Sequence, residues 1–120
     1  MVVDDDPSVL ALHRSFLGRV GGIEVVATAD RGAKVVGLVD EHRVELVLLD
    51  IGLPDIDGVE VLRELRERIG PDVAVVMVTA QSDRETVRRV VHHGVDGYLV
   101  KPFHLDEFVS RLERVRDVLR

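Results

Sequence analysis

The sequence contains no cysteine, which excludes disulfide bonds and thiolate metal sites. It also lacks any apolar run near the roughly 20 residues that a membrane-spanning helix needs, and no charged-then-apolar leader opens the chain. A net charge of −6 disfavours a chain that binds nucleic acid by itself. We therefore expect a cytoplasmic protein without membrane contacts.

The apolar residues that are present alternate between two kinds of segment within one predicted domain, residues 1–120. Short β-branched runs predict strands at Val2–Val3, Ile23–Ala27, Val44–Leu49, Val73–Val78 and Tyr98–Val100. Stretches with helical spacing predict helices around 9–16, 62–69, 82–93 and 105–119, and a weaker one after residue 30. Five strands alternating with five helices predict an α/β domain with a parallel sheet between helices.

Boundary residues support several of these helices. Asp6 followed by Pro7 has the features of an N-cap with proline at the first helical position. Ser82 and Glu85 have the spacing of a capping box. Asp30 is the candidate cap of the second helix.

Charged and polar residues follow four of the predicted strands. Asp4 and Asp5 end the first, Asp50 the third, Thr79 the fourth and Lys101 the fifth. In open α/β sheets ligands bind outside the carboxyl ends of the strands, so these side chains are expected to meet at one rim. Each has an ordinary explanation when taken singly, such as a cap or a solvated lysine. Their coincidence is what favours a functional site.

Gathered carboxylates need a balancing charge, because two of them about 4 Å apart repel by roughly 4 kcal/mol at an effective dielectric near 20. Carboxylate oxygens without histidine or cysteine suit a hard cation, and Mg²⁺ typically takes one or two of them and shares oxygens with a phosphate. Lys101 would add a second positive charge. Such a site favours attack of the Asp50 oxygen on a phosphoryl group, with the cations neutralising the spreading charge.

Four segments in this order resemble the receiver domain of two-component response regulators across essentially the whole chain. They are "VVDDDPSV", "LVLLDIGLPDIDGVEVL", "VMVTA" and "GVDGYLVKPF". The first and last are also similar to the regulators of citrate and malate metabolism. The resemblance implies a flavodoxin-like, doubly wound sheet of five parallel strands in the order 2-1-3-4-5 with five helices. It further implies a sensor histidine kinase as the partner and the control of an output, typically transcription. DNA would be bound only by an output domain, which we expect to be absent from this chain.

The resemblance also implies roles for individual residues around the phosphorylation site. Asp50 resembles the phosphoacceptor. Asp5 resembles the direct Mg²⁺ ligand and Asp4 a ligand acting through water, and Asp50 with the backbone carbonyl of Gly52 would complete the metal site. The resemblance describes a signalling domain rather than an enzyme with turnover, although the domain takes part in its own phosphorylation and dephosphorylation.

Further residues resemble the parts of the switch that respond to phosphorylation. Thr79 resembles the hydroxyl that moves to the new phosphoryl oxygen, and Ala80 the small residue that leaves room for it. Lys101 resembles the lysine that pairs with the phosphoryl group and precedes a cis Pro102, and Tyr98 resembles the aromatic that turns inward. The surface of the fourth helix, fifth strand and fifth helix would then change shape.

Opposite charges lie on the two helices of that surface. Arg84, Arg88 and Arg89 are on the fourth helix, and Asp106, Glu107, Glu113 and Asp117 are on the fifth. The two faces are solvated, or they pair across a two-fold homodimer. The apolar row of the fifth helix is expected to face the core.

Two alternatives from other classes remain open at the level of sequence. A haloacid-dehalogenase-type phosphatase would use Asp4 as nucleophile and Asp6 as acid, although a later acidic pair and a cap domain are lacking. A plain doubly wound binding or scaffold domain would carry the acidic rim without chemistry. The very short first strand departs from the receiver pattern. We expect the chain to be either a free-standing receiver or a fragment of a longer regulator, and the citrate-type resemblance favours the fragment.

Overall fold

The computed structural model describes residues 1–80, 85, 88 and 94–119. Its five strands form one parallel sheet in the order β2-β1-β3-β4-β5, as the resemblance implied. The strands are β1 (Val2–Val3), β2 (Thr28–Ala29), β3 (Leu46–Asp50), β4 (Ala74–Thr79) and β5 (Gly97–Val100). The helices are α1 (Pro7–Leu17), a 3₁₀ turn η1 (Gly32–Lys34), α2 (Val35–His42), α3 (Gly58–Arg68) and α5 (Leu105–Leu119).

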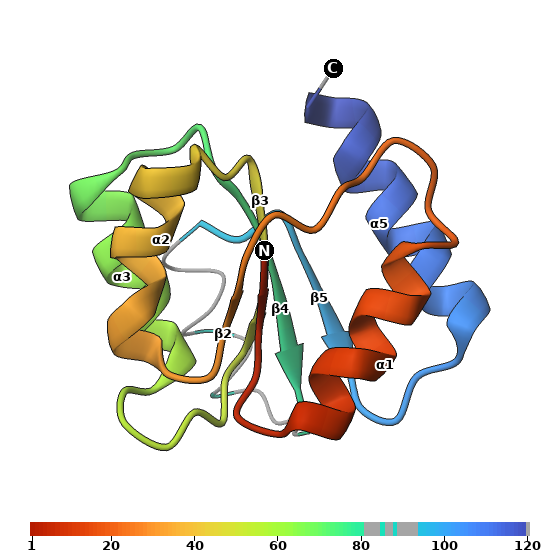
Figure 1. The fold of residues 1–120 in the computed structure, drawn as a ribbon, viewed down its shortest axis with the longest axis horizontal. Helices are drawn as coiled ribbons and strands as arrows, with labels where there is room; N and C mark the ends of the chain where they lie inside the picture. The colour runs from red at the N-terminus through yellow and green to blue at the C-terminus, as the bar shows by residue number, and fades with distance from the viewer. Residues whose placement is uncertain (81–84, 86–87, 89–93, 120) are drawn as a thin grey trace.

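Helices cover both faces of the sheet, with α2 and α3 on one side and α1 and α5 on the other (Figure 1). β3 and β4 carry apolar side chains on both faces because both faces are covered. Two apolar clusters result, one centred on Leu62 and Leu65 of α3 and the other on Phe108 and Leu112 of α5. Phe108, Leu112 and Val115 in the apolar row of α5 are therefore core, as predicted, whereas Leu119 at the end of the row is 37% exposed.

Aspartates fix the starts of the helices, although not all in the predicted way. Asp6 caps α1, and its carboxylate accepts a 2.8 Å hydrogen bond from the Ser8 amide. The prediction for Asp30 was wrong, because its carboxylate pairs with Lys34 instead. The amides of Gly32 and Ala33 donate to Asp55, which lies 23 and 22 residues further along the chain.

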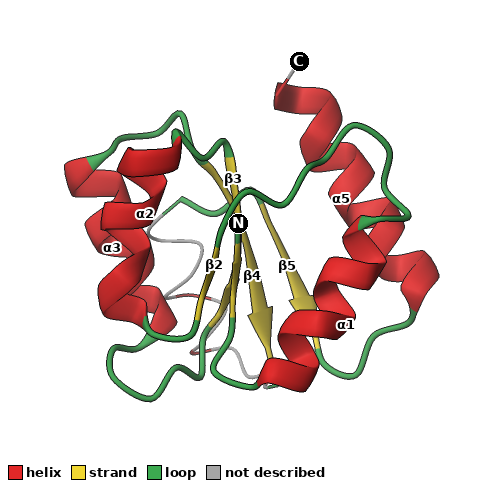
Figure 2. Ribbon diagram, viewed as in Figure 1, coloured by secondary structure: helices red, strands yellow, loops and turns green. Residues whose placement is uncertain are grey.

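The predicted second strand was misplaced. Residues 23–27 have no strand structure, and β2 occupies only Thr28–Ala29 (Figure 2). A strand exists only where a neighbour supplies hydrogen bonds, and β1 reaches no further back than Val2. Within "IEVVA", only the Ala27 carbonyl accepts a hydrogen bond from β1, from the Val2 amide at 3.2 Å, so residues 23–26 have strand propensity without a partner in that strand.

Four α-helices lie within the described residues, whereas five were predicted. The fourth predicted helix, with Ser82, Arg84 and Arg89, falls mostly on residues outside those that the structure describes. No helix in the described part of the chain is long and apolar enough to cross a membrane.

Candidate functional site

The sheet brings the predicted site residues to one edge. Asp4 directly follows β1, Asp50 ends β3, and the two strands are paired side by side. Thr79 ends β4 and is paired with Val100, so Lys101 follows next to it. The Lys101 amide donates a 2.6 Å hydrogen bond to the Thr79 carbonyl. The strand order therefore places three acidic residues, a hydroxyl and an ammonium group along one rim.

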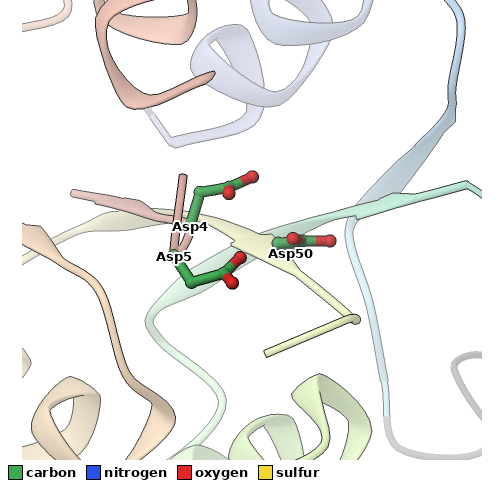
Figure 3. A group of neighbouring side chains, drawn as sticks. All are labelled: Asp4, Asp5 and Asp50. Atoms are coloured by element: carbon green, nitrogen blue, oxygen red, sulfur yellow. The ribbon is translucent and has the colours of Figure 1, made fainter. Parts of the chain in front are cut away.

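Three carboxylates form a compact cluster within this rim. Each of Asp4, Asp5 and Asp50 offers an oxygen, and these oxygens lie within 4.8 Å of one another. Figure 3 shows the carboxylates of Asp5 and Asp50 pointing toward the same space, with Asp4 beside them. Asp4 and Asp50 are only 2% and 8% exposed, whereas Asp5 is open to solvent. The cluster thus combines two buried ligands with one accessible ligand.

The Asp4 carboxylate is incompletely satisfied by the described residues. One oxygen accepts a 2.9 Å hydrogen bond from the Asp6 amide. The other, Oδ2, is buried without a hydrogen-bond partner among the described residues, and its nearest ion-pair partner is Lys101 Nζ at 3.6 Å. Leaving a buried charged oxygen unpaired is unfavourable by several kcal/mol in apolar surroundings. Because all the donors are hard oxygens, the set fits a hard divalent cation.

Asp50 is held by the loop that follows it. Its Oδ1 accepts a 3.2 Å hydrogen bond from the Gly52 amide, and the Gly58 amide returns to the Ile51 carbonyl at 2.9 Å. Burial raises the pKa of the Asp50 carboxyl above its ordinary value, and Asp4 acts in the same direction. The Gly52 amide and Lys101 oppose this shift by favouring the anion. A bound cation would favour the anion further.

This shift predicts how stability depends on pH in metal-free protein. A carboxyl with a raised pKa holds its proton more tightly in the folded chain than in the unfolded chain. Its ionisation therefore destabilises the folded state progressively as the pH rises above 3.8, the ordinary pKa of the group. We expect Asp50→Asn to melt about 3 °C or more above the unsubstituted protein at pH 7.5 in EDTA. The difference should shrink toward pH 4 in thermal unfolding. Asp72→Asn, at an exposed loop position, is the control, and an equal gain there would contradict this explanation.

The remaining predicted site residues lie at or near the carboxyl ends of β4 and β5. The Lys101–Pro102 peptide bond is cis, which confirms that prediction. Thr79 is 4% exposed, and the side chain of Lys101 is 31% exposed. Tyr98 is 37% exposed on β5, and Ala80 is exposed just beyond β4.

Sequence reasoning missed one residue next to the site. His13 of α1 is 3% exposed and stacks on Phe103 and Phe108, with ring centroids 5.8 and 6.1 Å away. Burial lowers its pKa, while the charge of Asp4 acts in the opposite direction. The sequence feature that could have predicted its burial is its position four residues after Val9, on the apolar side of α1. The His13 ring is therefore a packed core side chain near Asp4 and Lys101.

Together, the fold and the rim define a small flavodoxin-like α/β domain with an acidic site at the carboxyl edge of its sheet. The chain belongs to the response regulator receiver family, because the family model described as "Response regulator receiver domain" matches residues 1–113. Receiver domains are signalling domains rather than classical enzymes.

Curated relatives and solved structures agree with this assignment. The chain is 36% identical over 116 residues to the probable C4-dicarboxylate response regulator DctR of Priestia megaterium, covering 97% of this chain and 50% of that protein. It is 42% identical over 114 residues to the transcriptional regulatory protein PrrA of Mycobacterium tuberculosis, covering 94% and 47%. The chain therefore spans about half the length of these relatives. A response regulator of the LuxR family from Aurantimonas superposes with a TM-score of 0.91 at 28% identity, covering 100% of this chain and 85% of that one.

The relatives also bear on the citrate and malate resemblance. They include the transcriptional regulatory protein MalR of Bacillus subtilis, 31% identical over 116 residues and covering 97% of this chain and 49% of that protein. Together with DctR, this supports a similarity to regulators of the C4-dicarboxylate type.

Proposed function

We propose that this domain is a phosphorylation-activated switch that accepts a phosphoryl group on Asp50 in a Mg²⁺-dependent reaction. One observation carries the proposal: a buried oxygen of Asp4, without a hydrogen-bond partner among the described residues, lies in one cluster with Asp5 and the candidate nucleophile Asp50, and Lys101 Nζ forms an ion pair with it at 3.6 Å. The rim therefore has the carboxylate to be modified and the positive charge to stabilise it.

In the proposed reaction, an Asp50 carboxylate oxygen attacks phosphorus and displaces the phosphodonor, which keeps the electron pair of the broken bond. Asp4, Asp5, Asp50 and the Gly52 carbonyl would hold Mg²⁺, which when bound neutralises negative charge on the phosphoryl oxygens. The Gly52 amide keeps one Asp50 oxygen in place. Lys101 supplies a charge-assisted hydrogen bond to the phosphoryl group.

Phosphorylation adds about two negative charges at the end of β3. We propose that this charge draws in the Thr79 hydroxyl and the Lys101 ammonium, and that Tyr98 then turns inward beside β4. The surface of helix 4, β5 and α5 would change and control an output, as the resemblance implied. Helix 4 lies mostly outside the described residues, so a homodimer through this face remains a proposal.

The proposed partners follow from the family. A sensor histidine kinase supplies the phosphoryl group, and the output is transcription in the cytoplasm, through a DNA-binding domain beyond this chain. Relatives named as C4-dicarboxylate regulators support a dicarboxylate-sensing pathway as the source of the signal. The phosphatase alternative is less well supported, because the carboxylate of Asp6, its proposed acid, is used as the cap of α1.

The proposal is tested with a small phosphodonor. We expect radiolabelled acetyl phosphate to label the protein in millimolar Mg²⁺ and to leave it almost unlabelled in EDTA, because the buried carboxylates need a cation before an anionic donor can approach. Intact mass should show a single added phosphoryl group. Equal labelling with and without Mg²⁺ would contradict the metal role, and no labelling in Mg²⁺ would contradict the proposal.

A further inference from the structure

The loop between β3 and α3 is fastened to a distant turn by one side chain, Asp55. Its Oδ1 accepts a 2.8 Å hydrogen bond from the Gly32 amide, and its Oδ2 accepts a 3.0 Å hydrogen bond from the Ala33 amide. Figure 1 shows the segment between β2 and α2, which contains these amides, at the same end of the sheet as the loop. The two oxygens of one carboxylate therefore bind two successive amides of η1.

This clamp, the pair of hydrogen bonds from Asp55 to η1, takes the place of a local cap. Arg31, the residue before η1, makes no capping hydrogen bond with its side chain. The Ala33 and Gly32 amides hold the pKa of the Asp55 carboxyl below its ordinary value, so the group is an anion at neutral pH. The start of η1 therefore depends on a charge that the β3–α3 loop supplies.

The turn and the loop are also in close contact beside the clamp. A Cβ on Gly32 would stand 2.7 Å from Val61 Cγ2 and 3.1 Å from Ile56 Cβ. Both distances are shorter than the roughly 3.5–4.0 Å of an ordinary carbon–carbon contact. Ile56 is the residue next to Asp55, so η1 lies directly against the part of the loop that the clamp holds.

The same loop carries Gly52, three residues before Asp55. Gly52 is exposed and has no side chain to pack, and its amide donates to Asp50 Oδ1 at 3.2 Å. Beyond Gly52 the loop is held by the buried Leu53 side chain and then by the clamp. Release of Asp55 would therefore loosen the segment that places Gly52 against Asp50.

We propose that Asp55 is a positioning residue for the metal site, because its clamp on η1 holds the loop that presents the Gly52 carbonyl. This inference rests on the proposed function, in which that carbonyl completes the Mg²⁺ ligand set. Asp55 is not a member of the acidic cluster, so it acts only through the loop. A carbonyl that moves more freely loses more conformational entropy when it binds a metal, which lowers the affinity while the nucleophile stays intact.

The test is a Mg²⁺ titration without phosphodonor, followed through the amide NMR signals around the site. Asp55→Ala is expected to raise the Kd for Mg²⁺ about tenfold, at the low end of the range for residues that orient metal ligands. Asp55→Asn keeps one acceptor oxygen for the two amides and should give an intermediate Kd. In acetyl phosphate labelling, Asp55→Ala should need about tenfold more Mg²⁺ for its half-maximal rate and approach the unsubstituted rate at saturation.

Asp96→Ala is the matched control. The Asp96 carboxylate also bridges two elements, accepting from the Val75 amide at 2.8 Å and from Arg66 at 3.3 Å, but it lies before β5, at the opposite end of the sheet. Both alanine variants should lower the urea midpoint, and only Asp55→Ala should weaken Mg²⁺ binding. If Asp55→Ala fails to fold, Asp55→Asn provides the same comparison.

The outcomes separate this inference from the proposed function. An equal rise of the Kd in the Asp55 and Asp96 variants, or no rise in either, would overturn the inference and leave the proposed function standing. A Mg²⁺ titration that produced no response in the unsubstituted protein would overturn the metal role in the proposed function, and this inference with it.

Discussion

Asp50→Asn is expected to lower the incorporation of phosphate from acetyl phosphate by at least about a hundredfold, because the amide removes the nucleophilic oxygen. The substitution preserves size, and an amide oxygen can still accept the hydrogen bond from Gly52 that Asp50 accepts at 3.2 Å. Loss of labelling would therefore report chemistry rather than unfolding. Radiolabel incorporation in Mg²⁺, with the melting temperature measured on the same samples, is the assay.

Two neighbouring substitutions make this result specific. Asp4→Asn should slow labelling about 10–100-fold through weaker metal binding while leaving Asp50 able to react. Asp6→Asn should label nearly as well as the unsubstituted protein, because Asp6 caps α1 and is absent from the acidic cluster. If instead Asp4→Asn abolished labelling and Asp50→Asn retained it, the phosphatase alternative would replace the proposal.

Gly58→Ala is expected to destabilise the protein by about 1–3 kcal/mol. A Cβ on Gly58 would stand 2.5 Å from the Asp50 carbonyl oxygen and 2.6 Å from the Ile51 Cα. Both atoms belong to the backbone, so relief requires the chain around Asp50 to move. Urea unfolding should show a lower midpoint, and phosphorylation should slow as well because the nucleophile is displaced.

Gly37→Ala supplies the matched control. Gly37 lies inside α2, and a Cβ there would meet nothing within 4 Å. Alanine favours the helix over glycine by about 0.5–1 kcal/mol, so this variant should be slightly more stable and label normally. If both alanine variants had the same midpoint as the unsubstituted protein, the close approach at Gly58 would not be a determinant of stability.

The acidic site was accessible to sequence reasoning for a geometric reason. Asp4, Asp50 and Thr79 each follow a buried apolar run, and parallel strands deliver their carboxyl ends to one edge. The cap at Asp6 was equally local, since donor and acceptor are two residues apart. Local patterns and one topological rule were sufficient for these positions.

Features that depend on distant pairing were not accessible in the same way. The strand expected over residues 23–27 requires a neighbour that Val2–Val3 alone does not provide. The start of η1 is bonded by Asp55 from the loop after β3, so the nearby Asp30 was a misleading candidate. His13 fitted the apolar spacing of α1, but its stacking partners come from the far end of the chain.

All three phenylalanines of the chain lie with His13 on the face covered by α1 and α5. Phe103 is two residues beyond Lys101, and its ring contacts those of Phe16 and Phe108. Aromatic rings shift the magnetic resonance frequencies of nearby nuclei, so this group is a built-in spectroscopic probe. Displacement of Lys101 would change the His13 ring proton signals, whereas the aliphatic face under α2 and α3 would serve as the internal reference.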